Sequence, residues 1–570
     1  MDILNSRILK LVFLGICAYI VFYVIIDDMQ SSVPGYPEPQ YGFVTPADCS
    51  STACQCKSPV LLENTVNPDH VVGLGTEESC THDALAFAVA QGGTIVFDCG
   101  KDDFVTINVE SELELRPDID TIIDGGGKIA LDGGRANRVF NFKSDGYRSN
   151  MTRVVLQRLT IQNGKAPATQ YIPQDPSNTQ CAWGYKDGAG GAVRFQDGRL
   201  HVLDSIFKHN EAAPVGPDTG GGAIFASGAM EVIVVGSTFV ENVGSNGGAL
   251  GLLQSDGFFY NSVFEKNAAT GEGQNYSGAS GCPEFNHALQ GGAGGNGGAI
   301  AIDGRLVQHA KWCDVVFREN RANELATVFR TPNKQRGISS FEYALFEDNY
   351  AGAGGGAIWM NDMSFGMRNS AVIGNQSDGP GAGININQGS HGNTILLENT
   401  TIQGNIARNS LGGGLMFNGS GIIRNTTFAE NQAIGGDGFF GGAIVAHGRN
   451  AGQLRVQNTI FWNNFDEHEW TPMTCSIGDP KSPAVFIGSG NVQWPAQRNG
   501  PNKINDTPCT PGISFTDAML SEVAYNGGLT PTMIPGNEFV LELGHECPAL
   551  DQRGESRQEN ICASGAVEVR

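Results

Sequence analysis

Short apolar runs, separated by Gly, Asn and Asp, follow one another from about residue 94 to about residue 465. None of them shows the 3.6-residue spacing of an amphipathic helix, so this part of the chain is predicted to form short strands. One helix is predicted ahead of them, over residues 81–91 (THDALAFAVAQ), where apolar residues recur at helical spacing until Gly92 and Gly93. The pattern indicates an all-β protein with a helix at its N-terminal side.

A tetrad with Phe and Asn three positions apart recurs along the β-rich part. With two degenerate copies, Val372–Asn375 and Ile402–Asn405, successive starts lie 25 to 33 residues apart, and one interval of 53 is interpreted as doubled. A period of this length built from short strands predicts a solenoid. The full copies are Phe207–Asn210, Phe239–Asn242, Phe264–Asn267, Phe317–Asn320, Phe346–Asn349, Phe428–Asn431 and Phe461–Asn464.

A second tetrad, Gly-Gly-Ala-apolar, alternates with the first. Each Gly pair is predicted at a corner with positive φ, each Phe in the bore against the Phe one coil away, and each Asn in a ladder along the stack. These features predict a parallel β-helix whose first coil is covered by the helix at 81–91. The copies are Gly190–Val193, Gly221–Ile224, Gly247–Leu250, Gly297–Ile300, Gly355–Ile358 and Gly441–Ile444, with a variant at Gly413–Met416.

The N-terminus carries an apolar run, Leu11–Ile26, with Arg7 and Lys10 before it and two Asp after it. The run is slightly shorter than a bilayer span and slightly longer than the apolar core of a signal peptide. We expect an uncleaved transmembrane signal-anchor, with a cleaved signal peptide as the alternative. The predicted division of the chain is 1–28 signal-anchor or signal peptide, 29–79 Pro-rich stalk and Cys-containing linker, 80–470 β-helix, and 471–570 C-terminal closing segment.

Charge and cysteine content narrow the function classes. The chain has 36 basic and 59 acidic residues, a net charge of −23, so it lacks the basic footprint that nucleic-acid binding needs. Of its 13 cysteines, twelve follow the apolar segment, an even number typical of an exported, disulfide-bonded protein whose connectivity stays open. Cys49, Cys54 and Cys56 come first, and the disulfide candidates after them are Cys80, Cys99, Cys181, Cys282, Cys313, Cys475, Cys509, Cys547 and Cys562.

These motifs resemble known repeat proteins. The alternating tetrads resemble the repeats of bacterial polymorphic outer membrane proteins, and residues 121–134 (TIIDGGGKIALDGG) through 159–164 (LTIQNG) resemble the first coils of pectate-lyase-like right-handed β-helices. Residues 527–532 (GGLTPT), 547–554 (CPALDQRG) and 561–568 (ICASGAVE) are similar to the closing segment of exported "choice-of-anchor" β-helix proteins. The resemblance implies a right-handed winding and display outside the cell, and for the polymorphic proteins it implies adhesion.

This sequence lacks the residue patterns that β-helix enzymes use to cleave acidic polysaccharides. The repeats contain no Asp-Asp pair, no Gly-His-Gly and no Arg-x-Lys. The remaining catalytic candidates are Asp303 with Arg305, and Asp362, which we place on neighbouring repeats of one outer face; solvated turn carboxylates are the alternative. No metal or cofactor is predicted, and Ca²⁺ would enter only if the protein were a lyase.

Aromatic residues are the candidates for ligand binding. The residue after each Gly-Gly-Ala-apolar tetrad is expected to face outward, and Phe225, Trp359 and Phe417 in this column are predicted to stack on sugar rings unless loops cover them. Two insertions, residues 165–187 and 268–295, are expected on one side of the solenoid, three coils apart. They carry the further candidates Trp183, Tyr185 and Tyr276.

The sequence therefore predicts a cell-surface or secreted β-helix that acts as an adhesin, a glycan-binding protein or a structural subunit of a surface layer. The alternative is a polysaccharide lyase or glycoside hydrolase acting on an extracellular polysaccharide. The expected partners are an extracellular glycan or a cell-surface protein, and the membrane through the N-terminal segment, with no nucleic acid.

Overall fold

The structure is a computed structural model in which the chain divides into two units, Met1–Ser51 and Thr52–Arg570. The residues described all belong to the second unit. They are 56–100, 104–172, 184–185, 187–216, 219–271, 294–331, 337–361, 363–387, 394–435, 441–446, 453–467, 473–477, 485–498, 505–558 and 561–569. The predicted signal-anchor and most of the predicted stalk lie outside them.

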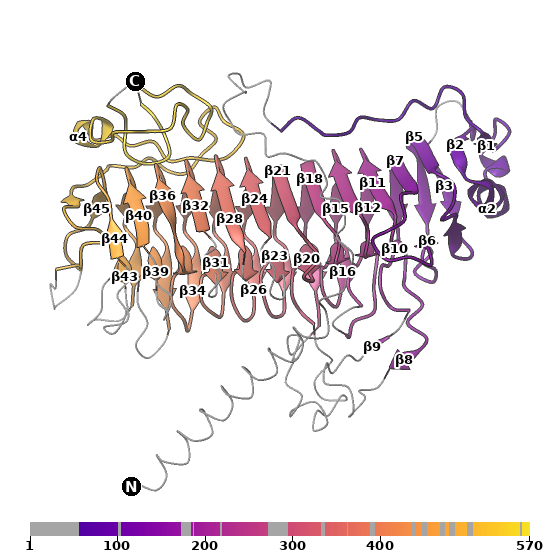
Figure 1. The fold of residues 1–570 in the computed structure, drawn as a ribbon, viewed down its shortest axis with the longest axis horizontal. Coiled ribbons are helices and arrows are strands. Elements are labelled where there is room, and N and C mark those ends of the chain that lie inside the picture. The colour runs from indigo at the N-terminus through magenta and orange to yellow at the C-terminus, as the bar shows by residue number, and fades with distance from the viewer. Residues whose placement is uncertain are drawn as a thin grey trace, which may run out of the picture. The chain divides into compact units, whose positions relative to one another are not determined.

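The second unit is a parallel β-helix whose coils stack along its long axis (Figure 1). A complete coil has four short strands: one in a 12-stranded sheet, two in successive rows of a 24-stranded sheet, and one in an 8-stranded sheet. Each strand pairs in parallel with the equivalent strand of the next coil, as Ile224 does with Leu250 and Phe239 with Phe264. Parallel pairing runs from residue 70 to residue 515, beyond both predicted boundaries at 80 and 470.

The strands are as follows. The 12-stranded sheet contains β4 (Leu113–Leu115), β6 (Phe140–Lys143), β10 (Val193–Gln196), β13 (Ile224–Ser227), β17 (Leu250–Leu253), β20 (Ile300–Asp303), β23 (Val328–Thr331), β27 (Ile358–Asn361), β31 (Ile384–Asn387), β35 (Leu415–Asn418), β39 (Ile444–Ala446) and β43 (Cys475–Ile477). The 8-stranded sheet contains β16 (Val243–Gly244), β19 (Ala268–Ala269), β22 (Arg321–Ala322), β26 (Tyr350–Ala351), β30 (Gln376–Ser377), β34 (Ile406–Arg408), β38 (Gln432–Ile434) and β42 (Phe465–Asp466).

The first row of the 24-stranded sheet contains β1 (His70–Val72), β2 (Gly93–Phe97), β5 (Thr121–Asp132), β7 (Arg153–Gln162), β11 (Arg199–Leu203), β14 (Glu231–Val235), β18 (Gly257–Glu265), β21 (His309–Arg318), β24 (Ile338–Glu342), β28 (Ser364–Arg368), β32 (Thr394–Glu398), β36 (Ser420–Arg424), β40 (Gln453–Gln457) and β44 (Val485–Ile487). Strands β5, β7, β18 and β21 continue into the second row. The second row also contains β3 (Val105–Asn108), β12 (Ile206–Lys208), β15 (Thr238–Val240), β25 (Leu345–Glu347), β29 (Ala371–Ile373), β33 (Thr401–Gln403), β37 (Thr427–Ala429), β41 (Ile460–Trp462), β45 (Val492–Trp494) and β46 (Ser514–Phe515). Outside these sheets are the antiparallel pair β8 (Tyr171–Ile172) and β9 (Gly184–Tyr185), and the helices η3 (Glu77–Ser79), α2 (His82–Gln91) and α4 (Glu538–Leu541).

The Phe residues of the repeated tetrad stack inside the bore. Phe239 is fully buried, and its ring centroid lies 4.9 Å from those of both Phe207 and Phe264. The stack continues to Phe317 and Phe346, at 5.2 Å and 4.6 Å, and Phe461 stacks on Phe428 further along. The bore is therefore closed by aromatic packing from one coil to the next.

The Asn residues of the same tetrad form a buried amide ladder. Asn242 Nδ2 donates to Asn267 Oδ1 at 3.0 Å and to the Phe207 carbonyl at 3.0 Å, while its own Oδ1 accepts from the amide of Asn210. The residue before each Asn adopts positive φ, as at His209 and Glu241, which turns the chain from the second row into the 8-stranded sheet. The ladder supplies hydrogen-bond partners to polar groups of the turns that would otherwise be buried without partners. It runs through Asn210, Asn242, Asn267, Asn320, Asn349, Asn375, Asn405, Asn431 and Asn464.

The first Gly of each of the six full Gly-Gly-Ala-apolar tetrads has positive φ, as at Gly221 with φ 70°, so these predicted corners are present. Two coils whose Phe-Asn tetrads were recognised have no Gly-Gly-Ala-apolar tetrad: Leu325-Ala326-Thr327 precedes the inward Val328 of β23, and Gly381-Ala382-Gly383 precedes the inward Ile384 of β31. The 53-residue interval is wrong as a doubled repeat: Phe264 pairs directly with Phe317, so it is one coil that contains the second insertion.

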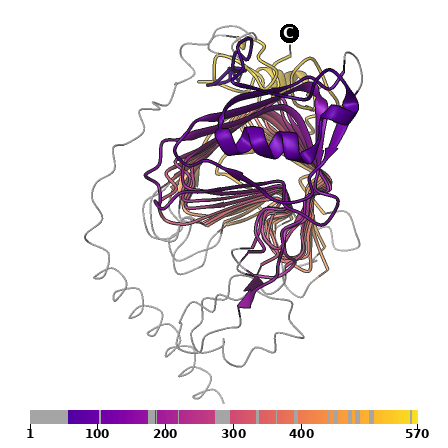
Figure 2. The same ribbon diagram turned by 90° about the vertical axis from the view of Figure 1, so that its right-hand side faces the viewer.

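Helix α2 forms where the apolar spacing predicted a helix, and it lies across the N-terminal end of the bore (Figure 2). The Thr81 hydroxyl accepts from the Ala84 amide, and the helix stops at Gly92 with φ 76°. Its buried side chains, Leu85, Ala88 and Val89, join the core and cover the first coil. The sheet end is thereby protected.

Four disulfides join described residues: Cys56–Cys313, Cys80–Cys99, Cys475–Cys509 and Cys547–Cys562. The other candidates, Cys181 and Cys282, lie outside the described residues. Bridges of this number are typical of proteins from oxidising environments, which places the protein outside the cell or at its surface. Across the described part of the chain, no helix has both the length and the apolar character to span a membrane.

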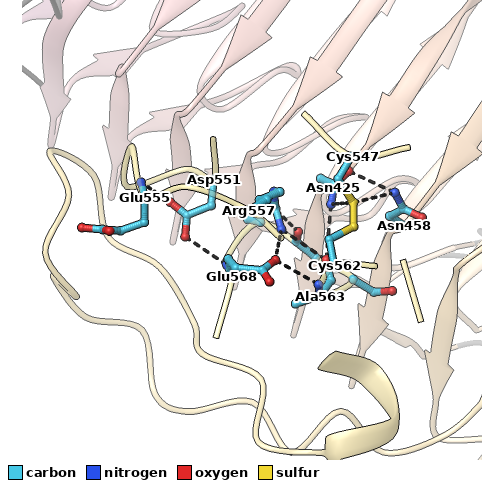
Figure 3. Close-up of polar contacts among 12 residues, drawn as sticks. Asn425, Asn458, Cys547, Asp551, Glu555, Arg557, Cys562, Ala563 and Glu568 are labelled. Atoms are coloured by element: carbon cyan, nitrogen blue, oxygen red, sulfur yellow. Dashed lines mark hydrogen bonds and ion pairs between the residues drawn. A yellow bond between two sulfur atoms is a disulfide. The ribbon is translucent and has the colours of Figure 1, made fainter. Parts of the chain in front are cut away.

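The C-terminal segment, residues 516–569, folds back over the outer face of the second row (Figure 1). Its closing motifs form a buried polar cluster (Figure 3). Arg557 and Glu568, each with a side chain 1% exposed, pair at 3.2 Å, and Arg557 also donates to Asn399 of the β-helix at 3.0 Å. Asp551 accepts from the Glu568 amide at 3.0 Å. These motifs therefore attach the chain's end to the solenoid.

Candidate functional site on the outer face of the 12-stranded sheet

The outer face of the 12-stranded sheet presents two columns of side chains, because alternate residues of each strand point outward. In the first column, Phe329 pairs with Trp359, and Trp359 with Asn385 of the next coil. In the second, Asp303 pairs with Thr331, and Asn387 pairs with both Asn361 and Asn418. The first column is Arg194, Phe225, Gly251, Ala301, Phe329, Trp359, Asn385, Met416, Val445 and Ser476.

Trp359 is the partly exposed aromatic residue of this face. Its ring lies against the corner of its own coil, where a Cβ added at Gly354 would be 2.7 Å from Trp359 Cζ3. Phe329, 7% exposed, packs in the same apolar cluster and supports the ring from the preceding coil. The indole is therefore packed against Gly354 and Phe329 and remains partly exposed to solvent.

Side-chain amides continue the surface beside the indole. Trp359 Nε1 donates to Asn361 Oδ1 at 3.2 Å, and Asn418 Nδ2 donates to Asn387 Oδ1 at 3.3 Å. Asn387 is exposed, whereas Asn361 and Asn418 are half-buried. Because neighbouring parallel strands lie about 4.8 Å apart, three coils of this surface span roughly 10 Å, the length of about two sugar rings. An aromatic ring beside amides that both donate and accept suits a polar, ring-shaped ligand.

Two of the three aromatic residues predicted for this face are not available. Phe417 is wrong as an outward residue: it is 1% exposed and packs in the bore, because Gly412 and not Gly413 forms the positive-φ corner and Leu415 takes the inward position. Met416 occupies the outer column instead. Phe225 does lie in the column but is only 9% exposed, with its ring over Gly251.

The carboxylate candidates do not meet as expected. Asp303 ends β20 and Arg305 follows it, both half-buried, while Asp362 lies outside the described residues. The strand that ends at Asp303, β20, and the strand that ends at Asn361, β27, are not on neighbouring coils as expected, because β23 lies between them. Among the residues that the structure describes, no group of three or more His, Cys, Asp or Glu side chains is arranged to hold a metal ion.

A carboxylate with a strongly shifted pKa, Glu231, lies on β14 of the 24-stranded sheet and not on the candidate face. Burial raises the pKa of Glu231, but hydrogen bonds from His201 at 2.9 Å and from Arg199 at 2.7 Å outweigh it, and the pKa falls to about 2. This carboxylate, on β14, is therefore ionised and paired, which suits a structural role.

Both insertions lead into the 12-stranded sheet, at β10 and β20, three coils apart in register. Of their aromatic candidates, Tyr185 on β9 is half-buried, and its backbone pairs with that of Tyr171. Trp183 and Tyr276 lie outside the described residues.

The outward amides and Phe329 are members of the candidate site that were not predicted from the sequence. The signal was available: the third residue after each inward apolar position reads Asn361, Asn387 and Asn418 on three successive coils. This period is obscured in the sequence because β23 and β31, the strands on either side of β27, follow no Gly-Gly-Ala tetrad that would align them with Trp359.

No protein-family model matches this chain and neither does any curated protein, so the resemblance to repeat families remains an interpretation of the motifs. Among solved structures, the chain is similar to PfbA, a surface adhesin of Streptococcus pneumoniae, with 11% sequence identity, a TM-score of 0.30, and coverage of 82% of this chain and 98% of that chain.

Proposed function

We propose that this protein is a surface-displayed β-helix that binds an extracellular glycan on the outer face of its 12-stranded sheet. The observation that carries the proposal is the partly exposed Trp359 ring beside the outward amides of Asn361, Asn387 and Asn418. Sites built on strands are held more rigidly than sites on loops, so little ordering is needed when the ligand binds.

The chemistry of the face favours a neutral glycan. Amides pair with hydroxyl and acetamido groups as donors and acceptors, and an indole packs on the apolar side of a pyranose ring. The net charge of −23 disfavours long polyuronates in the absence of a bridging cation. Neutral or N-acetylated sugars are therefore the expected ligands.

The proposal includes how the protein is displayed. The coils wind right-handed, as nearly all parallel crossover connections do. The apolar run Leu11–Ile26 anchors the chain in a membrane, with the disulfide-bonded β-helix on the outer side.

A glycan array tests the proposal with matched variants. Trp359→Ala and Asn387→Ala are expected to lower the signal of the bound glycans at least tenfold, since each removes a contact of the proposed face. Phe87→Ala is the control, because Phe87 is an aromatic residue 67% exposed on α2, at the end of the solenoid. Unchanged profiles for both face variants would refute the site.

A further inference from the structure

The described chain begins far from the coil that it first forms. Cys56 is bonded to Cys313 on β21, 257 residues later, and residues 56–69, the N-terminal strap, then run back along the outside of the 24-stranded sheet toward β5 and β1 (Figure 1). Only after the strap does the chain enter β1, the start of the first coil.

Polar contacts attach the second half of the strap to β7, β5 and β2. The Glu63 amide donates to Gln157 Oε1 at 2.8 Å, and Gln157 Nε2 donates back to the Glu63 carbonyl at 3.1 Å. Thr65 Oγ1 donates to Asp124 Oδ2 at 2.7 Å, and Asp69 accepts from the Thr94 amide at 2.8 Å. At the other end, Cys56 packs with Tyr260 and Tyr343 in an apolar cluster.

We propose that the Cys56–Cys313 bridge is a staple that carries mechanical tension. Any tension that reaches the protein from its N-terminal side arrives at Cys56, and the covalent bridge passes it directly to β21. Residues 57–312, which include the coils from β1 to β18, are then outside the force path. The proposal rests on the proposed function for the origin of the load, namely a membrane tether at one side and a bound glycan at the other.

The physical need for such a staple follows from solenoid architecture. Each coil contacts only its neighbours, so a terminal coil that is pulled away from the stack separates more easily than an internal one. Without the bridge, tension would enter through the strap at β1, whose strand pairs on one side only, with β2. With the bridge, tension enters a strand that is paired on both sides, by β18 and β24.

The candidate binding face lies in the part of the chain that carries tension when the bridge is intact. Trp359 on β27 and Asn387 on β31 follow Cys313 in the chain, on the next coils of the stack. Force between a bound glycan and the tether therefore crosses a few coils of the middle of the solenoid and none of the N-terminal ones.

Single-molecule force spectroscopy on the full-length chain, held by its two termini, tests the proposal. Extended chain measures about 3.3–3.6 Å per residue, so the 257-residue span corresponds to roughly 900 Å. The variant Cys56→Ser with Cys313→Ser is expected to extend up to roughly 850 Å further than the wild type on complete unfolding, because the Cys80–Cys99 bridge still closes 19 residues of the span. Its first coils are also expected to separate at lower force.

Two comparisons make the result specific. Cys80→Ser with Cys99→Ser is the matched control: this bridge lies inside the shielded span, so its removal should leave the extended length of the wild type unchanged. Wild-type protein treated with dithiothreitol on the instrument covers the case in which the staple variant does not fold. Its gain in length should exceed that of the variant, because the reductant also opens the other bridges. The proposal would be overturned if the staple variant were no longer than the untreated wild type, and if the reduced wild type gained no more than the loops of the other bridges. Glycan arrays at zero load separate the two ideas, because the staple variant should keep the wild-type profile.

Discussion

Replacing Glu568 with Gln tests whether the closing motifs hold the C-terminal segment on the β-helix. Arg557 and Glu568 are each 1% exposed, so solvent does not screen their interaction. Burial lowers the pKa of Arg557, and the carboxylates of Asp551 and Glu568 offset part of this effect. Removing one partner of a buried pair typically destabilises by about 3–5 kcal/mol, because the other charge stays buried. Gln still accepts a hydrogen bond, so we expect about 3 kcal/mol.

Hydrogen exchange is the suitable assay because the loss should be local. The amides of Cys562, Ser564 and Gly565 donate to Gly544, Val540 and Asn458, and they report opening of the segment. About 3 kcal/mol corresponds to roughly a hundredfold faster exchange at these amides, with ladder amides such as that of Asn210 unchanged.

Two further variants decide the interpretation. Glu555→Gln changes an exposed carboxylate of the same segment and should leave exchange as in the wild type. Arg557→Met with Glu568→Met removes both charges and should recover much of the protection, as replacement of a buried pair by apolar side chains often does. If Glu568→Gln and Glu555→Gln gave the same exchange rates, the reasoning would be refuted.

Two more predictions concern the scaffold. Asn242→Ala removes the acceptor of the Asn210 main-chain amide, one of the two acceptors of Asn210 Nδ2, and a donor to the Phe207 carbonyl, all of them buried. The variant should therefore be destabilised by about 3 kcal/mol in urea unfolding, against a few tenths for the exposed Asn323→Ala. Similar midpoints for the two variants would contradict the ladder's role. The pKa of Glu231 lies at about 2, below its usual 4.5. Its ionised form therefore stabilises the fold by about 3 kcal/mol above pH 4.5, and this stabilisation is lost as the pH falls toward 2. In melting temperatures measured against pH, Glu231→Gln should therefore fall below the wild type at pH 7 and converge with it near pH 2, whereas parallel curves would show that this carboxyl is not shifted.

The outer face shows where local sequence was insufficient. The segment Gly412-Gly413-Gly414-Leu415 allows two alignments with the tetrad, and a shift by one residue exchanges the inward and outward sides of a strand. Only the pairing of Leu415 with Ile384 and Ile444 fixes the choice and turns Phe417 into the bore. The candidate site was therefore predicted at Trp359 and missed at its amides.

The repeated tetrads by themselves determined that the chain forms a stack of coils, with aromatic packing and an amide ladder inside. They suffice because every coil meets the same demands from its neighbours: an aromatic ring to fill the bore, an amide to pair the turn, and a glycine at the corner. Only the tertiary structure decided what lies on the outside. The strap from Cys56, the bridge to Cys313 and the C-terminal segment held by Arg557 each contact coils that are distant in the sequence, and such contacts occur once, so no period in the sequence records them.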